Sequence, residues 1–225
     1  MIKTQTPVLV FDLDGTLVDT APDLLGALNA VLVREGRRPV NIADLRHLVG
    51  HGARAMLNEA FLRTGDGAPP EILPRLIDEF IAHYRAHIAD ESQPFPNVEA
   101  TLELLKANGA RMGVLTNKPQ ALVLPLLDAL NLSRFFGAIH GAGRYDYVKP
   151  DARVFHHVVE ELGGSGEDAV MIGDSKTDVA TARAAGVPVI LVSYGYTPTP
   201  VHELDADAIT GDFADIPLLA AQLAS

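Results

Sequence analysis

Two aspartates separated by a single residue stand directly after an apolar run near the start of this chain. Asp12 and Asp14 follow residues 8–10, whose apolar and β-branched side chains are typical of a buried strand. In an extended segment the two carboxylates share one face. Like charges that close are costly when both are ionised, so the pair needs either a shared proton or a bound cation. Gly15 then permits a turn that most residues resist.

Two later apolar runs also end in polar side chains. Thr116 and Asn117 close one of them, and Asp174 and Asp178 follow the other. Because the carboxyl ends of parallel strands lie along one edge of a doubly wound sheet, we expect these groups to converge with the first aspartates in one crevice. Lys149 precedes a predicted helix and can reach the same place. Acids, a hydroxyl and a lysine suit a hard divalent cation, Mg²⁺, together with a phosphoryl group.

Strand-like and helix-like segments alternate over most of the chain, which predicts an α/β fold with a doubly wound parallel sheet. The predicted strands are residues 8–10, 111–117, 138–141, 169–172, 188–192 and 208–210. The helices predicted between and after them are residues 98–108, 121–130, 152–162, 179–185 and 216–223.

A block of helical periodicity interrupts this alternation after the first strand. Residues 18–91 contain no convincing strand, and a proline-marked linker follows at 92–97. The predicted helices of the block are residues 22–34, 42–48, 53–62 and 71–88. We therefore predict a catalytic core made of residues 1–17 and 92–225, with an all-helical domain of residues 18–91 inserted into it.

Composition narrows the classes of partner. The 225 residues include 18 Lys and Arg against 29 Asp and Glu, which gives a formal net charge of −11. That charge disfavours nucleic acid and anionic membranes as partners and leaves small phosphorylated metabolites. Without cysteine, disulfides and thiolate catalysis are excluded. No signal peptide or membrane-spanning run is recognisable, so we expect a cytoplasmic protein. The sequence does not indicate an oligomeric state.

Four motifs in order resemble those of the haloacid dehalogenase-like hydrolases. They are FDLDGT at residues 11–16, TNKP at 116–119, KP at 149–150 and GDSKTD at 173–178. The resemblance extends over essentially the whole core. The helical block occupies the position of that family's helical cap domain. The resemblance implies a phosphohydrolase with an α/β core and a cap.

The family resemblance also implies roles for the first two aspartates. Asp12 would be the nucleophile, which attacks phosphorus in line and forms an aspartyl-phosphate intermediate. Asp14 would be the general acid that protonates the leaving alkoxide, and then the base that activates water. Asp12 would also bind the metal through its carboxylate, and Asp14 through its backbone carbonyl.

The remaining motif residues would hold the metal and the phosphate. Asp174 would be the main additional carboxylate on Mg²⁺, and Asp178 would orient it or the metal waters. Thr116 and the Asn117 amide would hold phosphoryl oxygens, and Lys149 would neutralise charge on both the nucleophile and the phosphate.

Differences among members of this family narrow the choice of reaction. Asp14 argues against dehalogenases and phosphonatases, which lack the second aspartate, and the predicted cap contains no lysine for Schiff-base chemistry. The segment 50–54 resembles the glycine-rich substrate loop of phosphoglycolate phosphatases, where His51 and Arg54 would face a carboxylated substrate. We expect a Mg²⁺-dependent phosphomonoesterase acting on 2-phosphoglycolate. The alternatives are a phosphatase for a sugar or amino-sugar phosphate, a β-phosphoglucomutase, or a catalytically silent module that binds a phospho-ligand.

Overall fold

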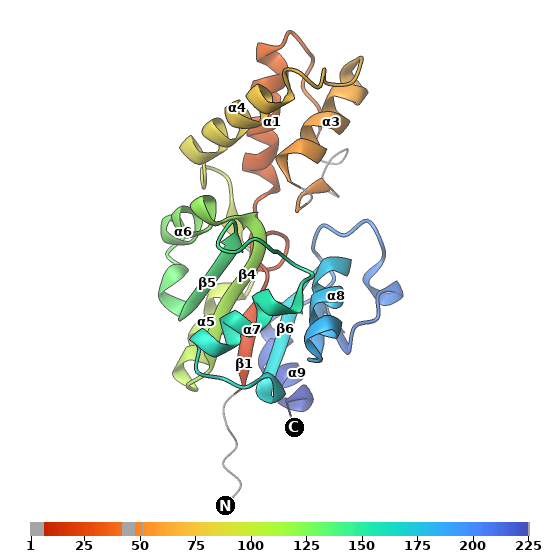
Figure 1. Ribbon diagram of the computed structural model, residues 1–225. Helices are drawn as coiled ribbons and strands as arrows, with labels where there is room; N and C mark the ends of the chain where they lie inside the picture. Colours follow the sequence, from red (N-terminus) through yellow and green to blue (C-terminus); the bar gives the residue numbers. More distant parts are fainter. Residues whose placement is uncertain (1–6, 42–47, 51, 225) are drawn as a thin grey trace, which may run out of the picture. The chain divides into compact units, whose positions relative to one another are not determined.

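A six-stranded sheet with strand order β5-β4-β1-β6-β7-β8 forms the centre of the larger part of the chain (Figure 1). The computed structural model describes residues 7–41, 48–50 and 52–224. Every neighbouring pair in this sheet is parallel, which confirms the predicted fold class. The strands are β1 (Val8–Phe11), β4 (Arg111–Pro119), β5 (Ala138–Ala142), β6 (Ala169–Gly173), β7 (Val189–Val192) and β8 (Ala208–Thr210).

The register of the central strands brings their carboxyl ends level with one another. Phe11 pairs with Val114 of β4 on one side and with Ile172 of β6 on the other. All four residues of β1 are buried, as expected for a strand that is covered on both faces. The polar residues that follow β1 and β6, beginning with Asp12 and Asp174, therefore emerge at the same edge of the sheet.

Helices cover both faces of the sheet. In Figure 1, α7 and α8 lie in front of it, while α5 and α9 lie behind. Alternate residues of β1, Val8 and Val10, pack against Phe155 and Val158 of α7, in a core cluster that Ala182 of α8 also joins. The helices are α5 (Val98–Ala107), α6 (Gln120–Ala129), α7 (Ala152–Glu161), α8 (Lys176–Ala185) and α9 (Ile216–Leu223).

Helix α8 begins at Lys176, before the predicted start at residue 179, so the predicted boundary was wrong. The backbone N–H and the hydroxyl of Ser175 both donate to Asp178 Oδ2, at 3.0 and 2.7 Å. This capping at the helix N-terminus stabilises a first turn whose residues carry no apolar periodicity. Strand β4 likewise runs to Pro119, beyond the predicted end at 117.

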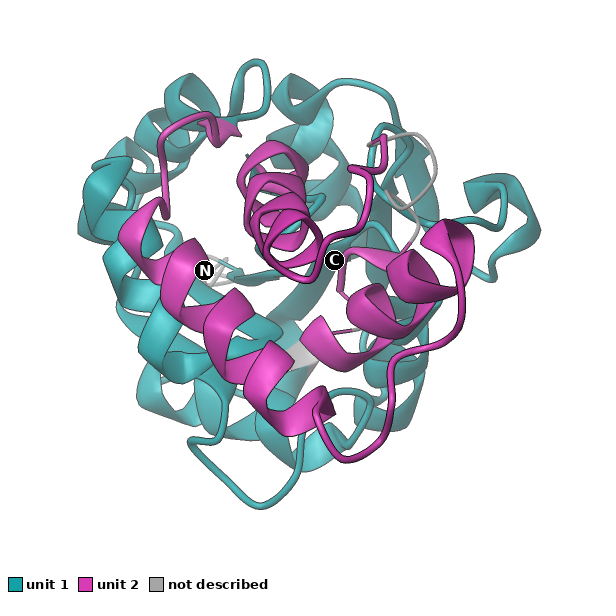
Figure 2. Cartoon of the chain, turned by 90° about the horizontal axis from the view of Figure 1, so that it is seen from above, with its two compact units in different colours: residues 1–18, 94–225 teal, residues 19–93 magenta. Residues whose placement is uncertain are grey.

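Residues 19–93 form a second compact unit, drawn in magenta in Figure 2. Its helices α1 (Ala21–Arg34), α3 (Ala53–Thr64) and α4 (Leu73–Ala86) pack pairwise against one another. Leu28, Phe61 and Tyr84 are completely or almost completely buried within it. The helix predicted at 42–48 falls almost wholly on residues 42–47, which lie outside the described residues.

Two very short strands connect this unit to the other, which comprises residues 1–18 and 94–225. Strands β2 (Val18–Asp19) and β3 (Gln93–Pro94) form a two-stranded sheet. The expectation of no strand within 18–91 was therefore wrong at β2. A strand of two residues is too short to show the alternation from which strands are recognised.

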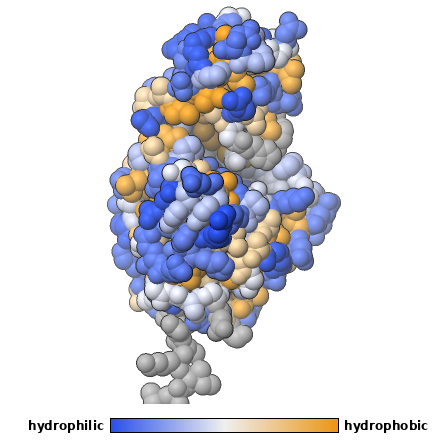
Figure 3. Space-filling model, in the orientation of Figure 1, coloured by the Kyte–Doolittle hydropathy of each residue, from blue (hydrophilic) through white to orange (hydrophobic). Residues whose placement is uncertain are grey.

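On the face of residues 7–18 and 94–224 drawn in Figure 3, hydrophilic side chains predominate and hydrophobic ones form small separate patches. Across the described ranges, none of the helices combines the length and the apolar character that crossing a bilayer requires.

Candidate active site

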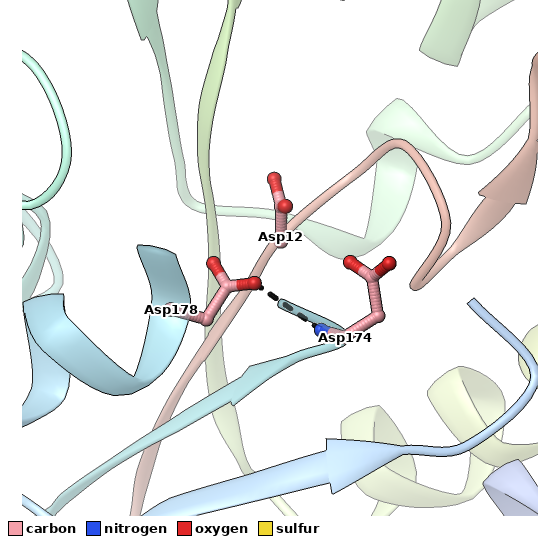
Figure 4. Close-up of side chains that lie close together, drawn as sticks. All are labelled: Asp12, Asp174 and Asp178. Carbon is pink, nitrogen blue, oxygen red and sulfur yellow. Dashed lines mark hydrogen bonds between the residues drawn. The ribbon is translucent and has the colours of Figure 1, made fainter. Parts of the chain in front are cut away.

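Three buried carboxylates meet at the carboxyl edge of the sheet. One oxygen each from Asp12, Asp174 and Asp178 lie within 4.8 Å of one another. Figure 4 shows that they come from the segment after β1, the segment after β6 and the first turn of α8. Asp178 is fully buried and Asp174 is 2% exposed. The structure thus brings Asp12 together with two carboxylates that lie more than 150 residues later in the sequence, as the strand order requires.

Lys149 lies between two of these carboxylates. Its ammonium nitrogen is 3.0 Å from Asp12 Oδ1 and 2.7 Å from Asp178 Oδ1. The side chain of Asn117 holds the lysine backbone from both sides: its oxygen accepts from Lys149 N at 3.0 Å, and its nitrogen donates to Lys149 O at 3.1 Å. Sequence reasoning missed this positioning role of the Asn117 side chain.

The cluster carries more negative charge than its buried environment tolerates. Burial, reinforced by the nearby Asp178 carboxylate and opposed by Lys149, raises the pKa of Asp12 to about 7. Burial and the charges of Asp178 and Asp12 raise the pKa of Asp174 to about 8. Burial alone would lower the pKa of Lys149, but the carboxylates of Asp12 and Asp178 outweigh it and raise that pKa. A further cation would relieve the remaining repulsion.

The donor set fits a hard divalent metal ion. Carboxylate oxygens are the ligands that Mg²⁺ and similar ions prefer, and three of them converge here. Asp174 is also held in orientation, because Thr16 Oγ1 donates to its Oδ1 at 3.2 Å and Tyr196 N donates to its Oδ2 at 2.7 Å. Outer hydrogen bonds of this kind fix a carboxylate for metal binding.

Glycines allow the chain to approach Asp174 closely. A Cβ atom at Gly195 would overlap the Asp174 carboxylate. Gly15 has a φ of 84°, and a Cβ there would lie 2.6 Å from Asp174 Oδ2. Both positions therefore require glycine for space, and Gly15 also requires it for its backbone conformation.

Asp14 has a basic neighbour that sequence reasoning missed. The ammonium of Lys118 lies 3.0 Å from Asp14 Oδ1 and 3.3 Å from Oδ2, and only 4% of the lysine side chain is exposed. Lys118 N also donates to Thr116 Oγ1 at 3.2 Å. The signal was present, because Lys118 belongs to the same TNKP segment as the two predicted phosphate ligands and lies on the same strand end.

The two substrate residues predicted in the helical block are His51 and Arg54. His51 lies outside the described residues. Arg54 lies in the first turn of α3 and is exposed.

Comparison with known proteins relates the whole chain to one family. The profile described as "Haloacid dehalogenase-like hydrolase" matches residues 9–192. A phosphoglycolate phosphatase of Caulobacter vibrioides is 50% identical over 209 residues, which cover 93% of this chain and 88% of the relative. One from Agrobacterium fabrum is 43% identical over 224 residues, covering 99% and 96%.

Solved structures agree with the sequence relatives. The crystal structure of a predicted phosphoglycolate phosphatase from Haemophilus somnus matches with a TM-score of 0.89 and 30% identity, over 96% of this chain and 99% of that one. The profile match alone spans well over half of the 225 residues. The chain therefore belongs to the haloacid dehalogenase-like hydrolase family.

Proposed function

We propose that this protein is a Mg²⁺-dependent phosphomonoester hydrolase whose substrate is 2-phosphoglycolate. The observation that carries the proposal is the convergence of Asp12, Asp174 and Asp178 around Lys149 at one sheet edge. The curated relatives support the choice of substrate, since those that are 50% and 43% identical over most of the chain are both named phosphoglycolate phosphatase.

In the first proposed step, a carboxylate oxygen of Asp12 attacks phosphorus as the ester P–O bond breaks, which gives an aspartyl phosphate. Asp14 gives its proton to the departing glycolate oxygen. In the second step Asp14 takes a proton from water, whose oxygen attacks the phosphorus. The Asp12–phosphate bond then breaks, and inorganic phosphate leaves with Asp12 regenerated.

The other groups would position and neutralise the phosphoryl group. Asp12, Asp174 and the Asp14 carbonyl are the proposed metal ligands. Asp178 contacts Lys149 and would orient Asp174 or the metal waters. A bound Mg²⁺ would offset the charges of nucleophile and phosphate dianion, so that they can approach. Lys149 adds a second positive charge beside Asp12, and Thr116 and the Asn117 amide are the proposed phosphoryl-oxygen donors.

The proposed partner is a small phosphorylated metabolite, and the proposed compartment is the cytoplasm. The net charge of −11 supports the proposed partner, because an acidic chain repels nucleic acid and anionic lipid. The lack of cysteine is consistent with the reducing environment of the proposed compartment. His51 and Arg54 remain predicted substrate residues on the sequence resemblance alone.

Phosphate release from a panel of esters tests the proposal. We expect Mg²⁺-dependent hydrolysis of 2-phosphoglycolate with a higher kcat/KM than hexose or amino-sugar phosphates, and no conversion of β-glucose 1-phosphate to glucose 6-phosphate. Asp12→Asn should lower turnover at least about a thousandfold. Preference for a hexose phosphate would overturn the substrate assignment. Binding of phosphate esters without any turnover would instead support a silent binding module.

A further inference from the structure

Lys118 is a buried basic residue that has no role in the proposed mechanism. Its ammonium contacts both oxygens of Asp14, at 3.0 and 3.3 Å. The pair is nearly buried, with 4% of the lysine side chain and 10% of the aspartate side chain exposed. An ion pair at such a position loses much solvation, so it contributes little net stability to the fold.

The two lysines of the site stand beside different aspartates. Lys149 contacts Asp12, the proposed nucleophile, whereas Lys118 contacts Asp14, the proposed acid and base. In a phosphoryl transfer the attacking and leaving oxygens lie on opposite sides of phosphorus. The group that Asp14 protonates is the leaving oxygen, so Lys118 stands on the leaving-group side of the reaction.

The leaving group of 2-phosphoglycolate carries a charge close to its ester oxygen. A single methylene separates that oxygen from the carboxylate carbon. Once the ester oxygen lies within hydrogen-bond distance of Asp14, the carboxylate can therefore be turned toward the Lys118 ammonium, which contacts the same aspartate. A lysine offers three N–H donors and can bind a second carboxylate while it keeps a contact to the first.

We propose that Lys118 is a specificity-determining residue that binds the carboxylate of the leaving group. The unit of residues 1–18 and 94–225 would then itself select esters of short hydroxy acids. This inference rests on the proposed function, because it takes 2-phosphoglycolate as the substrate. The competing interpretation is that Lys118 only positions Asp14. In that case its loss would impair every phosphate ester by the same factor.

A matched pair of substrates separates the two interpretations. Ethyl phosphate replaces the carboxylate of 2-phosphoglycolate with a methyl group and keeps the rest. We expect K118M to lower the ratio of kcat/KM for 2-phosphoglycolate to that for ethyl phosphate by about tenfold or more. The change in the ratio should lie mainly in KM, because the carboxylate keeps its charge throughout the reaction. K118R, which retains the charge, should keep the ratio within about threefold of wild type.

Binding provides a readout that does not need turnover. With Mg²⁺ present, calorimetry should show K118M binding 3-phosphonopropionate about tenfold or more weakly than wild type does, with little change for propylphosphonate. K118Q takes the place of K118M if circular dichroism shows that K118M is unfolded. Equal losses for both substrates and both phosphonates would overturn the role of Lys118. A wild-type enzyme that does not prefer 2-phosphoglycolate would overturn the proposed function instead.

Discussion

Lys149 is the residue on which the charge balance of the site depends. One ammonium group compensates the carboxylates of Asp12 and Asp178, and all three side chains are buried. Removing one partner of a buried ion pair costs more than the pair contributes, because the remaining charge is left in a poorly polarisable environment. The lysine therefore matters for folding as well as for the proposed chemistry.

We expect Lys149→Met to lower the free energy of unfolding by about 3 kcal/mol at pH 8 and to lower turnover more than about a hundredfold. The loss of stability should shrink at pH 5, where Asp12, with its pKa raised to about 7, is protonated. Urea denaturation at the two pH values measures this. Lys106→Met, at an exposed lysine that donates to the Arg134 carbonyl, is the control and should cost under about 0.5 kcal/mol. Equal losses at pH 5 and pH 8 would contradict the charge argument.

Gly195 supplies a second prediction at this scale. A side chain there would displace the Asp174 carboxylate, which Tyr196 N and Thr16 hold from two sides. We expect Gly195→Ala to raise the Mg²⁺ concentration for half-maximal activity by about tenfold or more. Gly166→Ala is the matched control, since no atom lies within 4 Å of its added Cβ. Unchanged metal activation in Gly195→Ala would show that Asp174 tolerates displacement or does not hold the metal.

The sequence predicted which residues meet at the site better than it predicted how they meet. Asp12 and Asp174 follow apolar strands, and strand order fixes their common edge. The contacts of Lys118 with Asp14, and of the Asn117 side chain with the Lys149 backbone, depend on where the chain turns after each strand. Neither follows from spacing alone, because side-chain direction after a strand end depends on local backbone angles.

Among the elements, long apolar segments were predicted well and short polar ones were not. The buried strands β1, β6 and β7 lie within a residue or so of their predicted bounds. The first turn of α8 was missed because Lys176, Thr177 and Asp178 carry no apolar stripe. The capping pattern from Ser175 to Asp178 was the available signal. Strands of two residues, such as β2 and β3, offer no periodicity at all.

Helix α1 is tied to the end of its own unit by one buried carboxylate. Asp23, in its first turn, accepts hydrogen bonds from the backbone N–H of Glu91 and from both the N–H and the hydroxyl of Ser92. The two segments that enter and leave residues 19–93 are thereby joined within that unit. Charge-assisted hydrogen bonds to backbone donors are stronger than neutral ones.

We expect Asp23→Ala to lower the free energy of unfolding by about 2 kcal/mol, because it leaves buried N–H groups without their acceptor. Ser92→Ala removes one hydroxyl donor and keeps the backbone contacts, so it should cost about 1 kcal/mol or less. Chemical denaturation followed by circular dichroism compares the two. A cost for Asp23→Ala no greater than that for Ser92→Ala would mean that the backbone donors find water instead.

At the scale of the whole molecule, the chain forms two compact units, and it passes from one to the other at residues 18–19 and 93–94. The change from strand-helix alternation to continuous helical periodicity was the basis for predicting an inserted domain of residues 18–91, and the prolines near residue 94 for predicting its end. The connecting strands themselves could not be predicted, because their pairing joins residues more than 70 apart in the sequence.

The buried acids of the larger unit also link its stability to pH and to metal. Asp12 and Asp174 have folded-state pKa values raised to about 7 and about 8, mainly by burial. Both lie above the usual aspartate value of 3.8, so the folded state binds more protons than the unfolded state between these limits. Their contribution to stability is complete below about pH 4 and is lost as pH rises through about 7 to 8.

Metal binding should oppose this loss, because a cation binds only the ionised carboxylates. We expect the melting temperature in EDTA to fall between pH 6 and pH 8, and Mg²⁺ to raise it by several degrees more at pH 8 than at pH 6. Asp174→Asn is the control. It removes one of the raised carboxylates and one proposed ligand, so both the fall in EDTA and the extra stabilisation by Mg²⁺ should diminish. A Mg²⁺ effect of the same size at both pH values, or one unchanged in Asp174→Asn, would place the metal away from these carboxylates.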